Sequence, residues 1–115
     1  MITIEQTDNL VNAAILGEFT LADFKTFEEQ SLNKLKSHPD LNLLLDLRAM
    51  IDYTVDVAWE DIKFFASEHD KDFNKIAIVT DNQWITWTAW LSRTFINADL
   101  RAFGDYEEAK VWVQV

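Results

Sequence analysis

The side chains of this sequence that could support catalysis or bind a metal are few and poorly grouped. His69 and Asp72 lie three positions apart, so an imidazole and a carboxylate could share one metal ion there. The same residues suit a solvated helix end, where a protonated histidine meets the negative end of the helix dipole, and we favour that interpretation. The paired carboxylates are adjacent residues, which point to different faces of a helix: Glu28-Glu29, Glu60-Asp61 and Glu107-Glu108.

Nucleophilic and cofactor chemistry is equally sparse. The chain contains no cysteine, which excludes thiol catalysis, thiolate metal sites and disulfides. Its two glycines, Gly17 and Gly104, stand alone, so no glycine-rich loop is available to hold a phosphate. We therefore expect a protein that is not an enzyme and that uses no metal or cofactor.

The charge of the chain narrows the class of partner. Among 115 residues, 20 are acidic and 10 are basic, for a net charge of −10. Nucleic-acid binding depends on lysine and arginine displacing counterions, so we expect no nucleic-acid partner. Residues 1–20 show neither a basic start nor a long apolar run, so we expect a cytoplasmic location. With 49% hydrophobic residues and no linker-like stretch, residues 1–115 are expected to form a single domain.

The spacing of apolar residues predicts strands that alternate with helices. Strands are expected over residues 1–6, 10–19, 41–47, 75–80 and 100–103, and helices over 20–36, 57–70, 83–96 and 106–113. This ββαβαβαβα order favours an α/β fold. The sheet is expected to have five strands, to be mostly parallel with an antiparallel edge strand, and to carry about four helices.

Short polar signals mark the expected ends of several elements. Asp8-Asn9 suits the turn of a hairpin between the first two strands. Thr20 and Asp23 have the spacing of a capping box, in which a side chain and a backbone amide at a helix start satisfy each other. Asp105 is expected to cap the last helix, and residues 52–56 are expected to form a polar connection.

Aromatic residues make up 13% of the chain, and the helix predicted over 83–96 carries three of the five tryptophans. Trp84, Trp87 and Leu91 share one face of that helix, as an ordinary sheet-packing stripe does. Trp90 points away from this stripe. A helix that is apolar on more than one side is buried on several sides or contacts another molecule.

The helix predicted over 57–70 has the same feature. Phe65 belongs to its wide core face, whereas Val57 and Phe64 lie on the other side beside acidic residues. A single exposed apolar residue means little, but stray aromatics on two helices can form a patch or line a cleft. Whether these rings serve a function or only the core stays open at this stage.

The aromatic surplus leads to a first hypothesis for function. We expect a pocket between the sheet and the two helices that binds a hydrophobic small molecule or lipid, lined by Phe64, Phe65, Trp84, Trp87 and Leu91. Contact with a membrane or a protein partner, including a second copy of the chain, would use Val57, Phe64 and Trp90. The chain lacks a polybasic surface, so peripheral membrane contact would depend on inserted aromatics alone.

Several segments of the chain resemble the SpoIIAA-like family of small bacterial proteins. The resemblance spans essentially all 115 residues and rests on these segments: Leu44–Leu47, Ala58–Lys63, Lys75–Asp81 with Trp84-Ile85, Phe103, and Glu108-Ala109 with Trp112. It implies a STAS-like domain, related in fold to the CRAL-TRIO lipid carriers. That relation implies a hydrophobic ligand, or association with the inner membrane.

The same resemblance implies an alternative function. The anti-sigma factor antagonists of this fold are switched by phosphorylation of a serine in an Asp-Ser-Ser-Gly turn after the central strand. Here the corresponding stretch, residues 46–55, contains no serine and no glycine, and Thr54 is the one residue that could stand in. Its hydroxyl also suits an ordinary turn or helix cap. The alternative is therefore a regulatory protein-interaction module without the usual phosphoacceptor serine.

Overall fold

The computed structural model describes residues 1–53, 65, 68, 72–81, 88–89, 93 and 97–114. Their main sheet has the strand order β1-β2-β4-β6-β7. The strands are β1 (Ile2–Thr7), β2 (Leu10–Ile15), β4 (Leu41–Asp46), β6 (Phe73–Val79) and β7 (Asp99–Phe103). β1 runs antiparallel to β2, and the other neighbours are parallel. The predicted α/β fold, with its five-stranded sheet and antiparallel edge strand, is confirmed.

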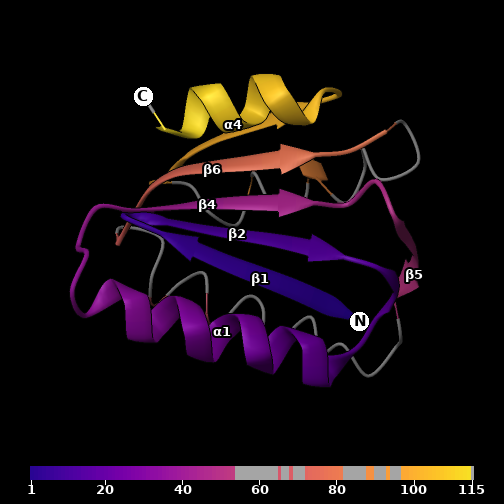
Figure 1. The fold of residues 1–115 in the computed structure, drawn as a ribbon, viewed down its shortest axis with the longest axis horizontal. Coiled ribbons are helices and arrows are strands. Elements are labelled where there is room, and N and C mark those ends of the chain that lie inside the picture. The colour runs from indigo at the N-terminus through magenta and orange to yellow at the C-terminus, as the bar shows by residue number, and fades with distance from the viewer. Residues whose placement is uncertain are drawn as a thin grey trace.

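In the described part of the chain, two helices lie on opposite sides of this sheet (Figure 1). α1 (Leu21–Leu35) packs on β1 and β2, and α4 (Tyr106–Gln114) packs on β4, β6 and β7. The helices expected over 57–70 and 83–96 are described only at residues 65, 68, 88, 89 and 93, which are helical. Their other residues lie outside the described ranges.

β2 and β4 each lead into a second strand that belongs to a separate small sheet. β3 (Gly17–Phe19) and β5 (Met50–Tyr53) pair in parallel. Gly17 has φ +66°, a left-handed conformation that turns the chain out of the main sheet. The prediction of one continuous strand over 10–19 is therefore wrong, because an apolar pattern does not reveal a single left-handed residue. The polar connection expected over 52–56 is also wrong where β5 reaches Tyr53.

The predicted turn and helix caps are confirmed. Asp8 has φ 45° in the two-residue turn that joins β1 to β2. At the start of α1, the Asp23 amide donates to Thr20 Oγ1 at 3.2 Å, and the Thr20 amide donates to Asp23 Oδ2 at 3.1 Å. At the start of α4, the Glu107 amide donates to Asp105 Oδ1 at 3.1 Å. These local bonds set where both helices begin.

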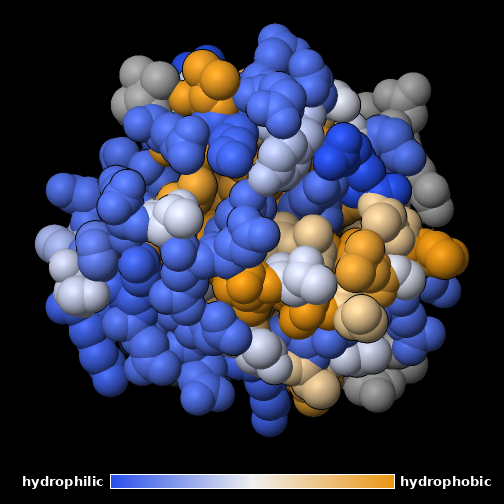
Figure 2. All heavy atoms as spheres, in the orientation of Figure 1, coloured by the Kyte–Doolittle hydropathy of each residue, from blue (hydrophilic) through white to orange (hydrophobic). Residues whose placement is uncertain are grey.

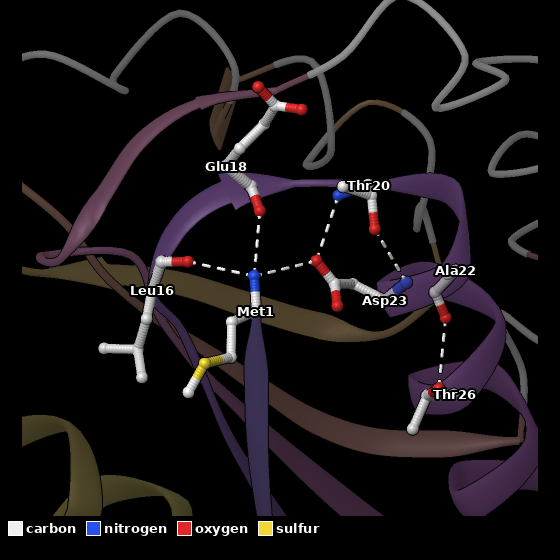
Figure 3. A network of polar contacts seen from close by, with 7 residues as sticks. All are labelled: Met1, Leu16, Glu18, Thr20, Ala22, Asp23 and Thr26. Atoms are coloured by element: carbon white, nitrogen blue, oxygen red, sulfur yellow. Dashed lines mark hydrogen bonds and ion pairs between the residues drawn. The ribbon is translucent and has the colours of Figure 1, made fainter.

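Met1, which immediately precedes β1, is tied to β3 and α1 by its ammonium group (Figure 3). The Met1 ammonium donates to Leu16 O at 3.0 Å, to Glu18 O at 2.9 Å and to Asp23 Oδ2 at 3.0 Å. Burial alone raises the pKa of Asp23, but hydrogen bonds from Thr20 and from the ammonium outweigh it and lower this pKa below its ordinary value. The capping carboxylate therefore stays charged.

Two apolar clusters in the described residues separate the helices from the sheet. The larger lies under α1 and includes Phe24, Phe27 and Phe65 with residues of every main strand. The smaller lies under α4 and is built around Leu44 and Val79. Each helix thus buries one apolar face against one side of the sheet.

Asn42 links three elements inside the fold. Its side chain is 3% exposed, donates to Val113 O of α4 at 2.8 Å, and accepts from the Lys75 amide of β6 at 3.0 Å. The pairing of β4 with β6 shifts register here, between Leu41 and Leu43. The Asn42 side chain therefore takes the place of a backbone hydrogen bond between β4 and β6, and it also satisfies a carbonyl in the last turn of α4.

Candidate functional site

The sheet face under α4 is only partly covered by that helix. α4 packs on β4, β6 and β7. The strand register places Asn12 between Glu5 and Leu44, and Ala14 between Thr3 and Asp46, so these side chains share the α4 face. On this face, Thr3 and Glu5 of β1 are exposed and, with Asn12 of β2, form a polar area beside the apolar part under the helix.

A pocket of about 190 Å³ lies where the open part of the face meets the end of β4. We call it the sheet-face pocket, and its lining residues are Thr3, Glu5, Asn12, Ala14, Asp46, Arg48 and Tyr106. Up to 103 positions of sequence separate these residues, and the pairing of β1, β2 and β4, together with the packing of α4, brings them together. The carboxyl ends of parallel strands are where α/β sheets commonly place their binding sites.

Asp46 and Arg48 form the fixed charged wall of the pocket. Arg48 Nε donates to Asp46 Oδ1 at 2.9 Å and Nη2 donates to Oδ2 at 2.8 Å, a bidentate pair. The Arg48 amide also donates to Oδ1 at 3.1 Å. The Asp46 side chain is 13% exposed and that of Arg48 is 49% exposed. The hydrogen bonds to Asp46 raise the pKa of Arg48 above its ordinary value, so its charge is permanent.

Tyr106, in the first turn of α4, joins this pair to β2. Its ring centroid lies 5.3 Å from Arg48 Cζ, a cation–π distance. Asn12 Nδ2 donates to Tyr106 Oη at 2.6 Å. Since Asp105 caps α4 immediately before Tyr106, the start of the helix sets the position of the ring. Asp46, Arg48, Tyr106 and Asn12 thus hold one another in place before any ligand arrives.

Glu5 and Thr3 form the opposite wall, on the edge strand β1. Both residues are exposed. No hydrogen bond or ion pair joins either side chain to the part of the chain that the structure describes. The pocket therefore contains two carboxylates and one guanidinium, and the pairing of Asp46 with Arg48 leaves the Glu5 carboxylate available. Its chemistry is suited to binding polar and charged groups.

Exposed apolar side chains occur close in sequence to the pocket residues Thr3 and Arg48. Met1 is 65% exposed and Ile51 is 73% exposed, and Ala49, which follows Arg48, is also exposed. The carbonyls of Met1 and Ala49 accept from the amides of Leu16 and Gly17, at 2.7 Å and 2.9 Å, so both residues are fixed to the junction between β2 and β3. Figure 2 shows apolar residues gathered toward the end of the molecule that carries the N-terminus and β5, on an otherwise hydrophilic face.

The predicted hydrophobic-ligand residues are mostly outside the described residues. Phe64, Trp84, Trp87 and Leu91 fall there, as do Val57, Trp90 and Thr54. Phe65 is described, and its side chain is 2% exposed. Its ring centroid lies 5.9 Å from that of Phe24 and 5.8 Å from that of Phe73, inside the cluster under α1. It therefore faces away from the sheet-face pocket.

The sequence did carry a weak signal for the sheet-face pocket. Asn12 is a polar residue in the middle of an apolar strand, and Asp46 ends a strand that is otherwise leucine-rich. A polar residue at such a position generally needs a partner. What the pattern could not show is that the partner of Asn12 lies 94 positions away at Tyr106.

No group of three or more His, Cys, Asp or Glu side chains in the described ranges is arranged to hold a metal ion. Among the described helices, none combines the length and the hydropathy that crossing a bilayer requires.

Comparison with known proteins agrees with this architecture. A family model described as SpoIIAA-like matches residues 10–114. The chain is similar to an uncharacterized protein with a SpoIIAA-like fold from Shewanella loihica, with 22% identity, a TM-score of 0.72, and coverage of 98% of this chain and 92% of that one. It is also similar to an anti-sigma factor antagonist from Mycobacterium paratuberculosis, with 16% identity, a TM-score of 0.59, and coverage of 100% and 96%. No curated protein sequence matches the chain significantly.

Proposed function

The chain belongs to the SpoIIAA-like family, and we propose that it is a non-enzymatic regulatory module that binds another protein through the sheet-face pocket and the exposed apolar residues Met1, Ala49 and Ile51. The similarity to an anti-sigma factor antagonist supports this class of function. We extend to this chain only the general role, a domain that regulates by binding a protein. A cytoplasmic location belongs to the same proposal.

The observation that carries the proposal is the composition of the site. The Asp46–Arg48 pair is bidentate, Tyr106 is hydrogen-bonded to Asn12, and the exposed Met1, Ala49 and Ile51 lie close in sequence to pocket residues. Protein interfaces combine arginine and tyrosine anchors with apolar contacts and a polar rim. A lipid would find little apolar surface in this pocket, whose lining is mainly polar.

The chemistry of the pocket also favours binding over catalysis. Arg48 is committed to Asp46, and the Tyr106 hydroxyl accepts from an amide, Asn12, which is neither an acid nor a base. No nucleophile in the pocket is hydrogen-bonded to a general base. The serine switch of the family's anti-sigma factor antagonists has no counterpart at residues 46–53, and Thr54 lies outside the described residues.

Site-specific cross-linking in the cells that make the protein tests the proposal. A photoreactive amino acid replaces exposed Ile51, three residues after Arg48 in the sequence, or exposed Glu29 on α1 as the control position. We expect a discrete protein adduct from position 51 that is lost when Arg48→Glu is added, and none from position 29. Equal adducts from both positions, or none from position 51, would contradict the proposal.

The hydrophobic-ligand hypothesis is the competing function and has its own test. Apart from Phe65, its residues lie outside the described ranges, so it stays a prediction. Native mass spectrometry of the purified chain should show the mass of the protein alone. A co-purifying acyl lipid at one equivalent would favour the lipid-binding function over the one proposed here.

A further inference from the structure

The Glu5 carboxylate is the one pocket charge that the described structure leaves without a partner. Glu5 is exposed on β1 and makes no described hydrogen bond or ion pair, whereas Asp46 receives the bidentate bonds of Arg48. Charges at protein interfaces are generally matched by the opposite charge on the partner. The free carboxylate therefore points to a cation as the group that completes the site.

The volume of the pocket selects a single side chain over a larger ligand. At about 190 Å³ it is smaller than the roughly 300–1,000 Å³ of typical small-molecule pockets. Ala14, with only a methyl group, lies between the two walls in register with Thr3 and Asp46. A larger residue at this position would fill the space.

The acceptors around the pocket suit a guanidinium group. The Glu5 carboxylate offers two acceptor oxygens, Thr3 a hydroxyl, and Asn12 its amide oxygen, since its amide nitrogen donates to Tyr106. Arginine presents five donors in a planar fork, which a carboxylate can accept in pairs, whereas lysine presents one compact ammonium. The net charge of −10 further favours a basic partner.

We infer that the sheet-face pocket accepts an arginine side chain of the partner protein, which pairs with Glu5 on the side opposite the Asp46–Arg48 pair. This inference rests on the proposed function and names the chemistry of the partner. It assigns Glu5 to recognition, and Asp46 and Arg48 to holding the opposite wall.

A titration with small probes tests the inference on the intact chain. N-acetyl-arginine amide is added to the ¹⁵N-labelled protein, with neutral N-acetyl-citrulline amide as the isosteric control and N-acetyl-lysine amide to compare cations. We expect saturable shift changes at Glu5, Asn12 and Arg48 with the arginine probe, weaker ones with lysine and none with citrulline. Equal binding of the citrulline probe, or shifts spread over the acidic surface, would overturn the inference.

Variants separate charge from shape. Glu5→Gln should weaken arginine binding about two- to fivefold, the range of an exposed ion pair. Glu29→Gln removes the same charge from α1 on the other face and should leave binding unchanged. Ala14→Val keeps every charge but narrows the pocket, so it should also weaken binding. If Glu29→Gln weakens binding as much as Glu5→Gln, the effect is general electrostatics and the site is refuted.

The outcome is distinguishable from that of the cross-linking experiment. A discrete adduct from position 51, combined with no arginine binding, refutes the arginine site and leaves the protein-binding function standing. Arginine binding without any adduct refutes the proposed function and leaves a cation-binding pocket.

Discussion

Asn42 is the residue whose replacement should most clearly show how α4, and with it Tyr106, is held on the sheet. Its amide nitrogen donates to Val113 O in the last turn of α4, and its amide oxygen accepts from the Lys75 amide. Both Asn42 and Val113 are buried, at 3% and 0% exposure. Water therefore cannot easily replace a lost partner.

Two substitutions at this position separate the acceptor role from the donor role. Asn42→Leu removes both hydrogen bonds, each worth roughly 1–3 kcal/mol where a buried partner is stranded, and regains about 1.5–3 kcal/mol by apolar burial. We expect a net loss of about 2 kcal/mol in the free energy of unfolding. Asn42→Asp keeps the acceptor but sets a carboxylate against the Val113 carbonyl, which should cost about 3–5 kcal/mol at neutral pH.

The penalty of Asn42→Asp should depend on pH in a direction fixed by this geometry. Burial beside a carbonyl raises the pKa of the new carboxyl in the folded state above its unfolded value of about 3.9. Above the folded pKa the whole penalty applies. Between the two pKa values it shrinks by about 1.4 kcal/mol per pH unit as the pH falls, because the protonated carboxyl can again donate to Val113 O.

Urea unfolding followed by tryptophan fluorescence at several pH values between 5 and 8 measures this penalty against the parent chain. Asn33→Asp, the same change at an exposed position of α1, is the matched control and should show a small difference that does not vary with pH. A penalty for Asn42→Asp that is the same at every pH would show that the donor role of this side chain is unimportant, and the reasoning would be wrong.

Four further perturbations have defined outcomes. Thr20→Ala should lower the free energy of unfolding by about 1 kcal/mol because it removes the cap of α1, and Thr20→Ser should not. Folding lowers the pKa of Asp23, so the charged carboxylate stabilises the fold above the unfolded-state pKa, and this stabilisation is lost as the pH falls through the folded-state pKa. Asp23→Asn should therefore make the free energy of unfolding, measured by urea at several acidic pH values, fall less steeply with decreasing pH. A pH dependence equal to that of the parent chain would contradict this. Arg48→Lys loses the fork that binds Asp46 and should abolish the cross-link from position 51 while changing stability by less than about 1 kcal/mol; a retained cross-link would argue against the site. Phe65→Ala should cost about 3–5 kcal/mol without altering the arginine titration, whereas a small loss of stability would indicate that this ring serves a ligand instead of the core.

Local signals predicted the ends of elements well. The Thr20–Asp23 capping box and the Asp8-Asn9 turn each involve only two to four neighbouring residues. The strands and the helix that these signals delimit are predicted directly by the spacing of apolar residues. The split of the strand after Ile15 escaped prediction because Gly17 alone, through its left-handed conformation, decides it. Secondary structure is thus readable wherever neighbouring residues determine it.

The site was not predictable in the same way, because its residues meet only through the sheet register. Thr3, Asn12 and Asp46 become neighbours when β1, β2 and β4 pair, and Tyr106 joins them from the last helix. The aromatic surplus instead favoured a hydrophobic pocket between the sheet and two helices. Periodicity assigns an aromatic ring to one face of a helix, but it does not show what fraction of the ring is buried. Phe65 is buried in the core.

Because β3 and β5 leave the main sheet, the segment between Asp46 and Met50 lies outside the strands of both sheets. β4 ends at Asp46 and β5 begins at Met50, and the Leu47 amide between them donates to the Val79 carbonyl of β6 at 2.8 Å. Arg48 and Ala49 therefore belong to neither β4 nor β5, and their side chains can be replaced without breaking the pairing between strands. Exchanging either side chain would therefore change the surface at the end of β4 and leave the strand pairing of the main sheet intact.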